Sequence, residues 1–148
     1  MSSWITISDD SDFSLRNLPY GVFSTSKLTQ RIGVAIGDFI LDLKTLAQDG
    51  VFSSLQFNSA TLEAPVLNPY AGLGRDVHRK FREYLTELLK ADTSLGSVLR
   101  DNDERKGKAL VPVKDVRMHL PMVIGDYTDF FVGEYHAQNV CQLFLPLE

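Results

Sequence analysis

The sequence has one cysteine, no run of basic residues and no long apolar stretch. Cys141 has no partner for an intramolecular disulfide, so we expect it to be a small buried hydrophobe. Without clustered Lys or Arg the chain lacks the positive field that phosphate backbones require, and we expect no nucleic-acid partner. No window approaches the roughly 18 apolar residues of a membrane span, and acids stand where a secretory signal would be basic. These absences predict no membrane partner and a reducing, cytoplasmic location.

The composition is that of a folded chain. Its 148 residues are 44% hydrophobic and 23% charged, with a formal net charge of -4. At roughly 150 residues per domain, this length fits one globular domain, or one domain and a fragment of another. The apolar content is sufficient for a sizeable core and excludes a mainly disordered chain.

The N-terminal part of the sequence has β character. Residues 20–25 are a short strand candidate, and Pro19 suits a strand entry because it has no amide donor. The segment 31–43 is the strongest strand prediction, because its apolar residues flank Gly37 and Asp38, a pair that favours a tight hairpin turn. Two or three short antiparallel strands indicate a small barrel or sandwich.

Helical spacing follows the hairpin. A short helix is expected from Leu43 until Gly50, with a further helical turn over 51–55. The clearest helix is predicted from about Arg75 to Lys90, where apolar residues recur every three or four positions.

The segments around this helix are less regular. Residues 65–72 contain two prolines and a glycine, which predict a loop. The polar segment 92–108 is expected to be a short helix or exposed linker, and 110–116 regains strand character.

The segment 124–140 brings carboxylates and an imidazole together with bulky aromatic side chains. Its acidic and histidine residues are Asp126, Asp129, Glu134 and His136. Carboxylate oxygens suit hard cations such as Ca²⁺ or Mg²⁺, and a neutral histidine suits general-base work near pH 7. A structural role is the alternative, and spacing alone favours it: Asp126 would cap a helix, Asp129 would complement its dipole, and His136 would be an ordinary surface or core residue.

Helical geometry gives the functional alternative a definite form. If residues 126–138 form one helix, Asp129 and His136 are seven residues apart and lie on the same face, at roughly 10 Å along the axis. That separation is too long for joint ligation of one ion, but both side chains could line one cleft. Gly133 could break the helix and change this distance.

Several motifs together resemble a known family. They are LPYGVFS at 18–24, RIGVAIGDFILDL at 31–43, YAGLG at 70–74, MHLP at 118–121, and IGDYTDFF with HAQNV within 124–140. In this order they resemble the N-terminal part of the fumarylacetoacetase family. The resemblance implies an α+β chain with a small SH3-like β-barrel domain with helical insertions at 1–118, followed at 119–148 by the truncated start of a β-rich catalytic domain.

The resemblance also implies chemistry. The family hydrolyses a carbon–carbon bond of the diketo acid fumarylacetoacetate, giving fumarate and acetoacetate in tyrosine and phenylalanine breakdown, and its full-length members are expected to be homodimers. By motif, Asp129 matches a Ca²⁺ or Mg²⁺ ligand and His136 matches the base that activates water. Phe131 stands where the family commonly has a substrate-contacting tyrosine, so this chain lacks that hydroxyl.

The C-terminus departs from the family pattern. Relatives carry an arginine shortly after a phenylalanine, whereas here Phe144 is followed by Leu-Pro-Leu-Glu. The family's other metal carboxylates, its lysine and the glutamate that orients its histidine belong to a part that this chain does not contain. We therefore expect an inactive fragment. The alternative is a noncatalytic docking or dimerisation module, suggested by the apolar tail 140–147.

Overall fold

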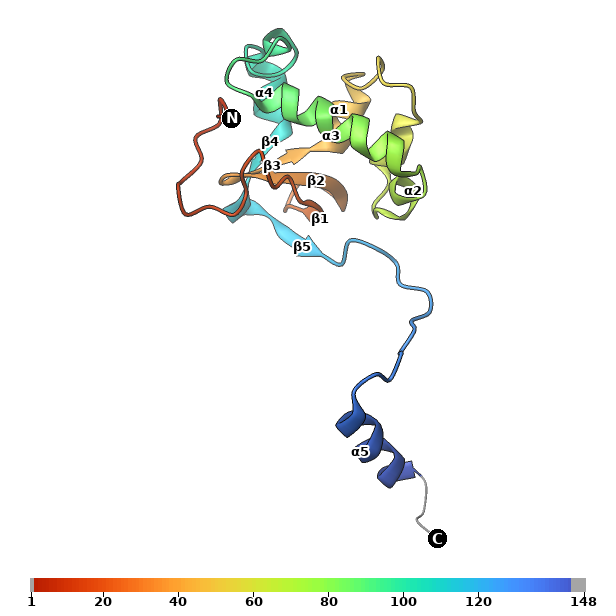
Figure 1. Cartoon of the computed structure of the whole chain (residues 1–148). Coiled ribbons are helices and arrows are strands. Elements are labelled where there is room, and N and C mark those ends of the chain that lie inside the picture. Colours follow the sequence, from red (N-terminus) through yellow and green to blue (C-terminus); the bar gives the residue numbers. More distant parts are fainter. Residues whose placement is uncertain (1, 145–148) are drawn as a thin grey trace.

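A five-stranded antiparallel sheet organises this computed structural model, which describes residues 2–144 (Figure 1). The strand order is β4-β3-β2-β1-β5, so β4 and β5 lie at its edges. The strands are β1 (Tyr20–Ser24), β2 (Arg31–Ile36), β3 (Phe39–Asp42), β4 (Leu110–Pro112) and β5 (Arg117–His119). Helices accompany the sheet, which confirms the predicted α+β class.

The predicted hairpin is confirmed. β2 and β3 pair in register from Gly33 opposite Asp42 to Ile36 opposite Phe39. The turn between them requires glycine, because Gly37 has a φ of 53°, in the left-handed region that side chains disfavour. The expected strand at 20–25 is confirmed as β1, which pairs with β2 on one side and β5 on the other.

The helices connect and cover the strands. They are α1 (Leu43–Gln48), the 3₁₀ turn η1 (Ser59–Glu63), α2 (Asn68–Ala71), α3 (Arg75–Leu89), the 3₁₀ turns η2 (Gly96–Val98) and η3 (Val113–Asp115), α4 (Asp103–Ala109) and α5 (Glu134–Phe144). The long helix predicted from about Arg75 to Lys90 is confirmed as α3. Its buried residues, Phe81, Leu85, Leu88 and Leu89, recur at helical spacing and pack into the core.

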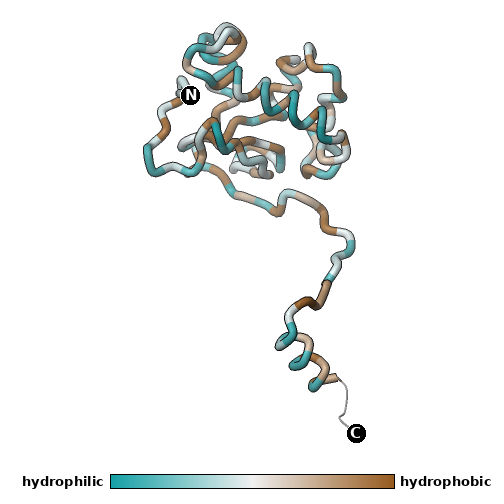
Figure 2. The backbone as a smooth tube through the Cα atoms, in the orientation of Figure 1, coloured by the Kyte–Doolittle hydropathy of each residue, from teal (hydrophilic) through white to brown (hydrophobic). Residues whose placement is uncertain are grey.

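Side-chain alternation along the strands builds a core on each face of the sheet. Val22, Val34 and Leu41 point to the main core, shared with α1 and α3. Their neighbours Phe23 and Ile40 point to the opposite face, where they form a smaller cluster with Val111. Figure 2 shows the hydrophobic segments running through the body of the domain.

Some local predictions were wrong. Residues 51–55 form hydrogen-bonded turns rather than a helical turn, and the predicted loop at 65–72 contains the short helix α2. Pro69 is compatible with that helix because it occupies its first turn, where an amide donor would be unpaired. Cys141 is exposed rather than buried, because it lies on α5, which has no buried residue.

After β5 the chain leaves the body of the domain. Residues 124–133 form no helix or strand, and α5 follows at a distance from the sheet (Figure 1). Figure 2 shows a strongly hydrophobic stretch just before α5. Within residues 2–144, no helix has the length and apolar character needed to cross a membrane. The division into 1–118 and 119–148 stays a prediction.

Candidate functional site

The residues singled out in the sequence lie on this projecting C-terminal segment. Asp129 and Phe131 precede α5, whereas His136 lies in its first turn. The surrounding aromatic side chains are open to solvent, with Tyr127 87% exposed and Phe130 81% exposed. The segment therefore presents its side chains outward, away from the core of the domain.

A local turn sets the orientation of the predicted site residues. Asp129 Oδ1 accepts a hydrogen bond from the backbone amide of Phe131 at 3.0 Å. Phe131 has a φ of 54°, an uncommon left-handed conformation for a residue with a bulky side chain. Its ring meets the His136 imidazole edge-on, with centroids 5.1 Å apart. The turn therefore links all three predicted residues in one local arrangement.

The single helix considered over 126–138 does not form. The helix begins only at Glu134, because the left-handed Phe131 interrupts helical geometry before Gly133. Asp129 and His136 thus do not share a helix face, and the axial separation of roughly 10 Å does not apply. Asp126 does not cap the helix and Asp129 does not lie in its first turn, because both precede Glu134 by several residues. The acidic residue of the first turn is Glu134 itself.

The described residues do not fit a metal centre on their own. Across residues 2–144, no group of three or more His, Cys, Asp or Glu side chains is placed to hold a metal ion. Asp129 is one carboxylate, and one of its oxygens already accepts a backbone hydrogen bond. Ca²⁺ and Mg²⁺ take about six or more oxygen ligands, so Asp129 alone makes an incomplete site.

Two hydrogen-bonded contacts that hold the base of the segment were not predicted. The Ser24 hydroxyl and His119 Nε2 lie 2.8 Å apart between β1 and β5. Asn68 forms two hydrogen bonds with the backbone of Val123, 55 residues further along the chain. No sequence pattern indicates either pair, because both depend on the path of the chain after β4.

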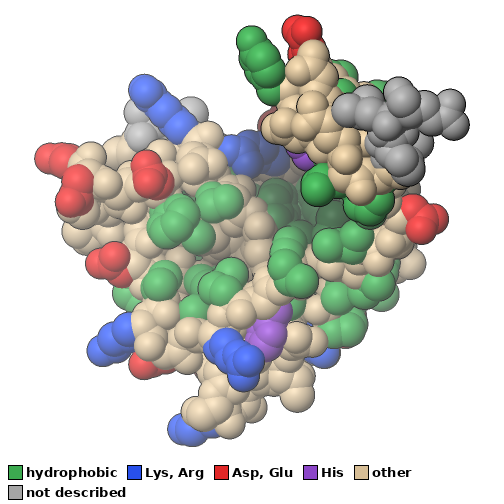
Figure 3. All heavy atoms as spheres, turned by 90° about the horizontal axis from the view of Figure 1, so that it is seen from below, with side chains coloured by type: hydrophobic (Ala, Val, Ile, Leu, Met, Phe, Trp, Pro, Cys, Tyr) green, Lys and Arg blue, Asp and Glu red, His purple; other side chains and the backbone are tan. Residues whose placement is uncertain are grey.

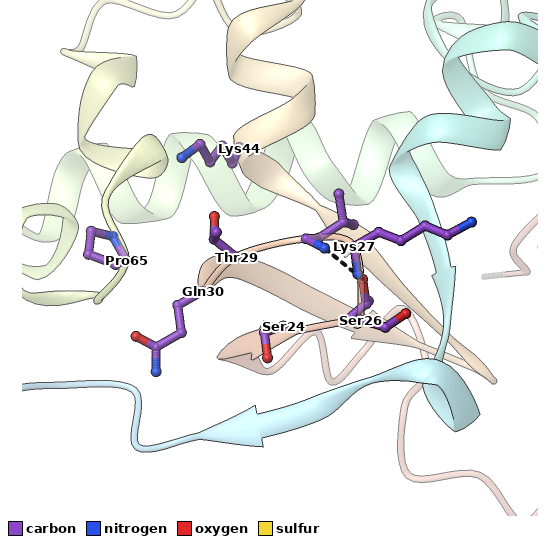
Figure 4. Close-up of a pocket in the computed structure, with 9 residues that line it drawn as sticks. Ser24, Ser26, Lys27, Thr29, Gln30, Lys44 and Pro65 are labelled. Carbon is purple, nitrogen blue, oxygen red and sulfur yellow. Dashed lines mark hydrogen bonds between the residues drawn. The ribbon is translucent and has the colours of Figure 1, made fainter.

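The structure also has a hollow beside the β1–β2 connection (Figure 4). Its volume is about 660 Å³, and hydroxyl, amide and lysine side chains line most of it. Lys27 extends away from the centre of the hollow, whereas Lys44 comes from α1 on its far side. Side chains that do not converge make this a poor candidate for a ligand site.

A smaller, apolar hollow lies on the outer face of the sheet. It measures about 190 Å³, and the cross-strand pair Gly21 and Gly33 contributes to its lining together with Phe13, Phe23 and Met118. Seen from below, hydrophobic side chains gather around the hollowed centre of this face (Figure 3). Its lining includes no acidic, basic, histidine or cysteine side chain, and Tyr20 is its one titratable residue.

Comparison with known proteins identifies the class to which this fold and segment belong. Residues 16–121 match the model of a family described as Fumarylacetoacetase N-terminal. These residues extend from before β1 to just beyond β5 and thus include the entire sheet. The chain belongs to the fumarylacetoacetase N-terminal family, as its motifs predicted.

Individual relatives extend the similarity beyond the matched region. The chain is 45% identical to a fumarylacetoacetase of Aspergillus fumigatus over 148 aligned residues, 46% identical to one of Emericella nidulans over 153, and 42% identical to one of Mus musculus over 143. These alignments cover 96–97% of this chain but only 33–34% of the relatives. The chain therefore spans about a third of the length of the curated relatives it matches.

Proposed function

We propose that this chain is the N-terminal part of a fumarylacetoacetase-type hydrolase. The full activity would be hydrolysis of a carbon–carbon bond of fumarylacetoacetate to fumarate and acetoacetate, in tyrosine and phenylalanine catabolism. The observation that carries this proposal is the family match over 16–121, continued by alignments that cover 97% of the chain. Because so few residues of the chain remain outside these alignments, the alignments include the segment from Asp129 to His136.

Two side chains of the segment would take part in the chemistry. We propose that His136 accepts a proton from the attacking water, because imidazole is the side chain suited to this near neutral pH. Its exposure on the first turn of α5 leaves the ring open to a substrate. Phe131 would contact the substrate through its ring alone, since it has no hydroxyl.

Asp129 would be one ligand of a Ca²⁺ or Mg²⁺ ion. The remaining ligands would have to come from polypeptide beyond this chain, because no group of three or more His, Cys, Asp or Glu side chains in residues 2–144 is placed to hold an ion that takes about six oxygens. For this reason the 148-residue chain is expected to be inactive by itself.

Other parts of the proposal concern architecture. We propose that the five-stranded sheet corresponds to an SH3-like barrel, supported by its short antiparallel strands and by apolar clusters on both faces. A homodimer is proposed for the full-length protein. A cytoplasmic location is proposed from the single cysteine.

The activity can be tested by restoring the missing part. The chain would be fused to the C-terminal two thirds of the Aspergillus fumigatus relative and supplied with fumarylacetoacetate and Mg²⁺ or Ca²⁺. We expect the ultraviolet absorbance of the diketone to disappear with the fusion but not with the 148-residue chain. His136→Ala should reduce the rate of the fusion by about 10²–10⁴-fold, the usual contribution of a general base. A folded fusion with no activity, or full activity of His136→Ala, would refute the proposal.

The alternative of a noncatalytic docking module has less support. Leu143 and Phe144 are 78% and 77% exposed, as that alternative expects, but residues 145–147 of the apolar tail lie outside the described residues. An enzyme fragment separated from its remaining two thirds would expose the same side chains. The relatives named above are all fumarylacetoacetases, which favours the hydrolase.

A further inference from the structure

We propose that Asn68 is a positioning residue that fixes the point at which the segment carrying Asp129 leaves the domain. Its side-chain Nδ2 donates to the carbonyl oxygen of Val123 at 3.0 Å, and its Oδ1 accepts from the Val123 amide at 2.9 Å. One amide side chain thus satisfies both backbone groups of Val123, as a neighbouring strand would. We call this pair of bonds the Asn68 clasp.

The clasp is attached to the core through α2. Two residues after Asn68, Tyr70 is buried and stacks on Tyr20 of β1 with ring centroids 5.4 Å apart. The carbonyl oxygen of Tyr70 lies 2.9 Å from His78 Nε2, which joins α2 to α3. Asn68 is therefore held by contacts to a strand and to the long helix, although its own side chain is exposed.

Within residues 2–144, the clasp is the last hydrogen-bonded attachment of the C-terminal segment to the body. β5 ends at His119, and the Leu67 amide then donates to the Pro121 carbonyl at 2.8 Å. Beyond Val123, the described residues up to 144 have no hydrogen bond to the rest of the domain. Asp129 follows six residues later, a span of at most about 20 Å, so fixing Val123 limits where Asp129 can lie.

The consequence for Asp129 rests on the proposed function, whereas the clasp itself does not. Each hydrogen bond of this exposed kind contributes only modestly to the stability of a domain. Removing both should therefore release Val123 locally without unfolding the domain. The expected effect is confined to residues after Pro121, because the bond from Leu67 is made by backbone atoms.

The test is amide hydrogen exchange and ¹⁵N relaxation of the 148-residue chain in solution. In Asn68→Ala, the Val123 amide should exchange roughly tenfold faster and its heteronuclear NOE should fall. The amide of Leu67 should be unaffected, and so should the melting temperature. Asn58→Ala is the matched control, because Asn58 is likewise an exposed asparagine whose side chain accepts from a backbone amide, that of Ala60, but it has no hydrogen bond to Val123.

A second variant separates the clasp from a general effect on α2. In Asn68→Asp, an ionised carboxylate can accept from the Val123 amide but cannot donate to its carbonyl oxygen, so near pH 7 the Val123 NOE should lie between those of the wild type and Asn68→Ala. At about pH 3.5 the protonated acid can again donate, and the Val123 NOE should recover toward the wild-type value measured at the same pH.

Two results would overturn the proposal. One is a Val123 amide equally ordered in the wild type and both variants. The other is a loss of protection that spreads through α2 and α3, which would make Asn68 a stabilising residue of the domain only. Both readouts concern backbone order, so they are independent of whether the fused enzyme cleaves fumarylacetoacetate.

Discussion

Arg31 on β2 and Asp42 at the end of β3 form a buried ion pair in which Arg31 Nη1 donates to Asp42 Oδ2 at 3.0 Å. The same carboxylate caps α1, because it accepts from the Thr45 amide at 3.1 Å and from the Thr45 hydroxyl at 2.8 Å. Asp42 thus joins the hairpin to the first helix, and its side chain is fully buried.

Asp42→Ala should destabilise the domain strongly. The substitution leaves the Arg31 guanidinium buried without its charge partner and removes the helix cap, and breaking such a pair costs about 3–5 kcal/mol. Urea unfolding followed by circular dichroism measures this change. Asp76→Ala is the control, because its ion pair with Arg79 is exposed and should contribute within about 1 kcal/mol. Equal effects of the two substitutions would contradict the assigned role.

Gly33→Ala should also destabilise the domain. Gly33 faces the smaller core, and a Cβ there would meet Ile40 and lie 2.8 Å from Phe23 Cε1. Overpacking of this kind costs about 1–3 kcal/mol. Gly107→Ala in α4 is the matched control, because nothing lies within 4 Å of its added Cβ and alanine favours a helix by up to about 1 kcal/mol. Thermal unfolding should show opposite signs, and a neutral Gly33→Ala would be inconsistent with this packing.

Alkaline pH should weaken the domain through its buried tyrosines. Burial raises the pKa of Tyr70, helped by its hydrogen bond to the Tyr20 hydroxyl, and burial also raises the pKa of Tyr20. Because the folded state favours the neutral phenols, their contribution is complete below pH 10 and is lost as pH rises through the folded pKa values.

The loss can be measured as the free energy of unfolding at pH 8 and pH 11. Each tyrosine that stays neutral in the folded state should lower stability by up to about 1.4 kcal/mol at pH 11. Tyr70→Phe has no phenol to ionise, so its stability should decline less over this range. An identical decline in Tyr70→Phe would show that other groups control the alkaline limit.

Calcium and magnesium should bind the 148-residue chain only weakly. With one carboxylate where about six oxygens are needed, calorimetric titration should give dissociation constants of about a millimolar or weaker. Asp129→Asn should abolish any heat of binding that this titration detects. Micromolar affinity would mean that this chain completes a metal site by itself, contrary to the placement of its described residues.

Sequence patterns predicted the central elements because local chemistry determines them. The hairpin around Gly37 depends on a turn that glycine permits, and α3 depends on apolar residues at helical spacing. By contrast, sequence patterns predicted a helical turn at 51–55 that does not form, and they missed α2 within 65–72. Short segments with few periodic residues are decided by tertiary contacts, such as the burial of Tyr70 beside β1.

The candidate site was only partly accessible from the sequence. Its residue types and order were sufficient to indicate the family, which comparison confirmed, and the roles of Asp129, Phe131 and His136 stay predictions. The arrangement of these side chains could not be predicted, because periodicity does not reveal that Phe131 adopts a left-handed backbone conformation. The helix therefore begins only at Glu134.

The sequence by itself determined the α+β class, the hairpin, the long helix and the family, because hydrophobic periodicity, turn residues and motif order are local properties. Only the tertiary structure decided that Arg31 is paired with Asp42, that Asn68 holds Val123, and that Asp129 lies outside α5. These are contacts between distant residues or competitions between local conformations, and their outcome depends on how the whole chain packs.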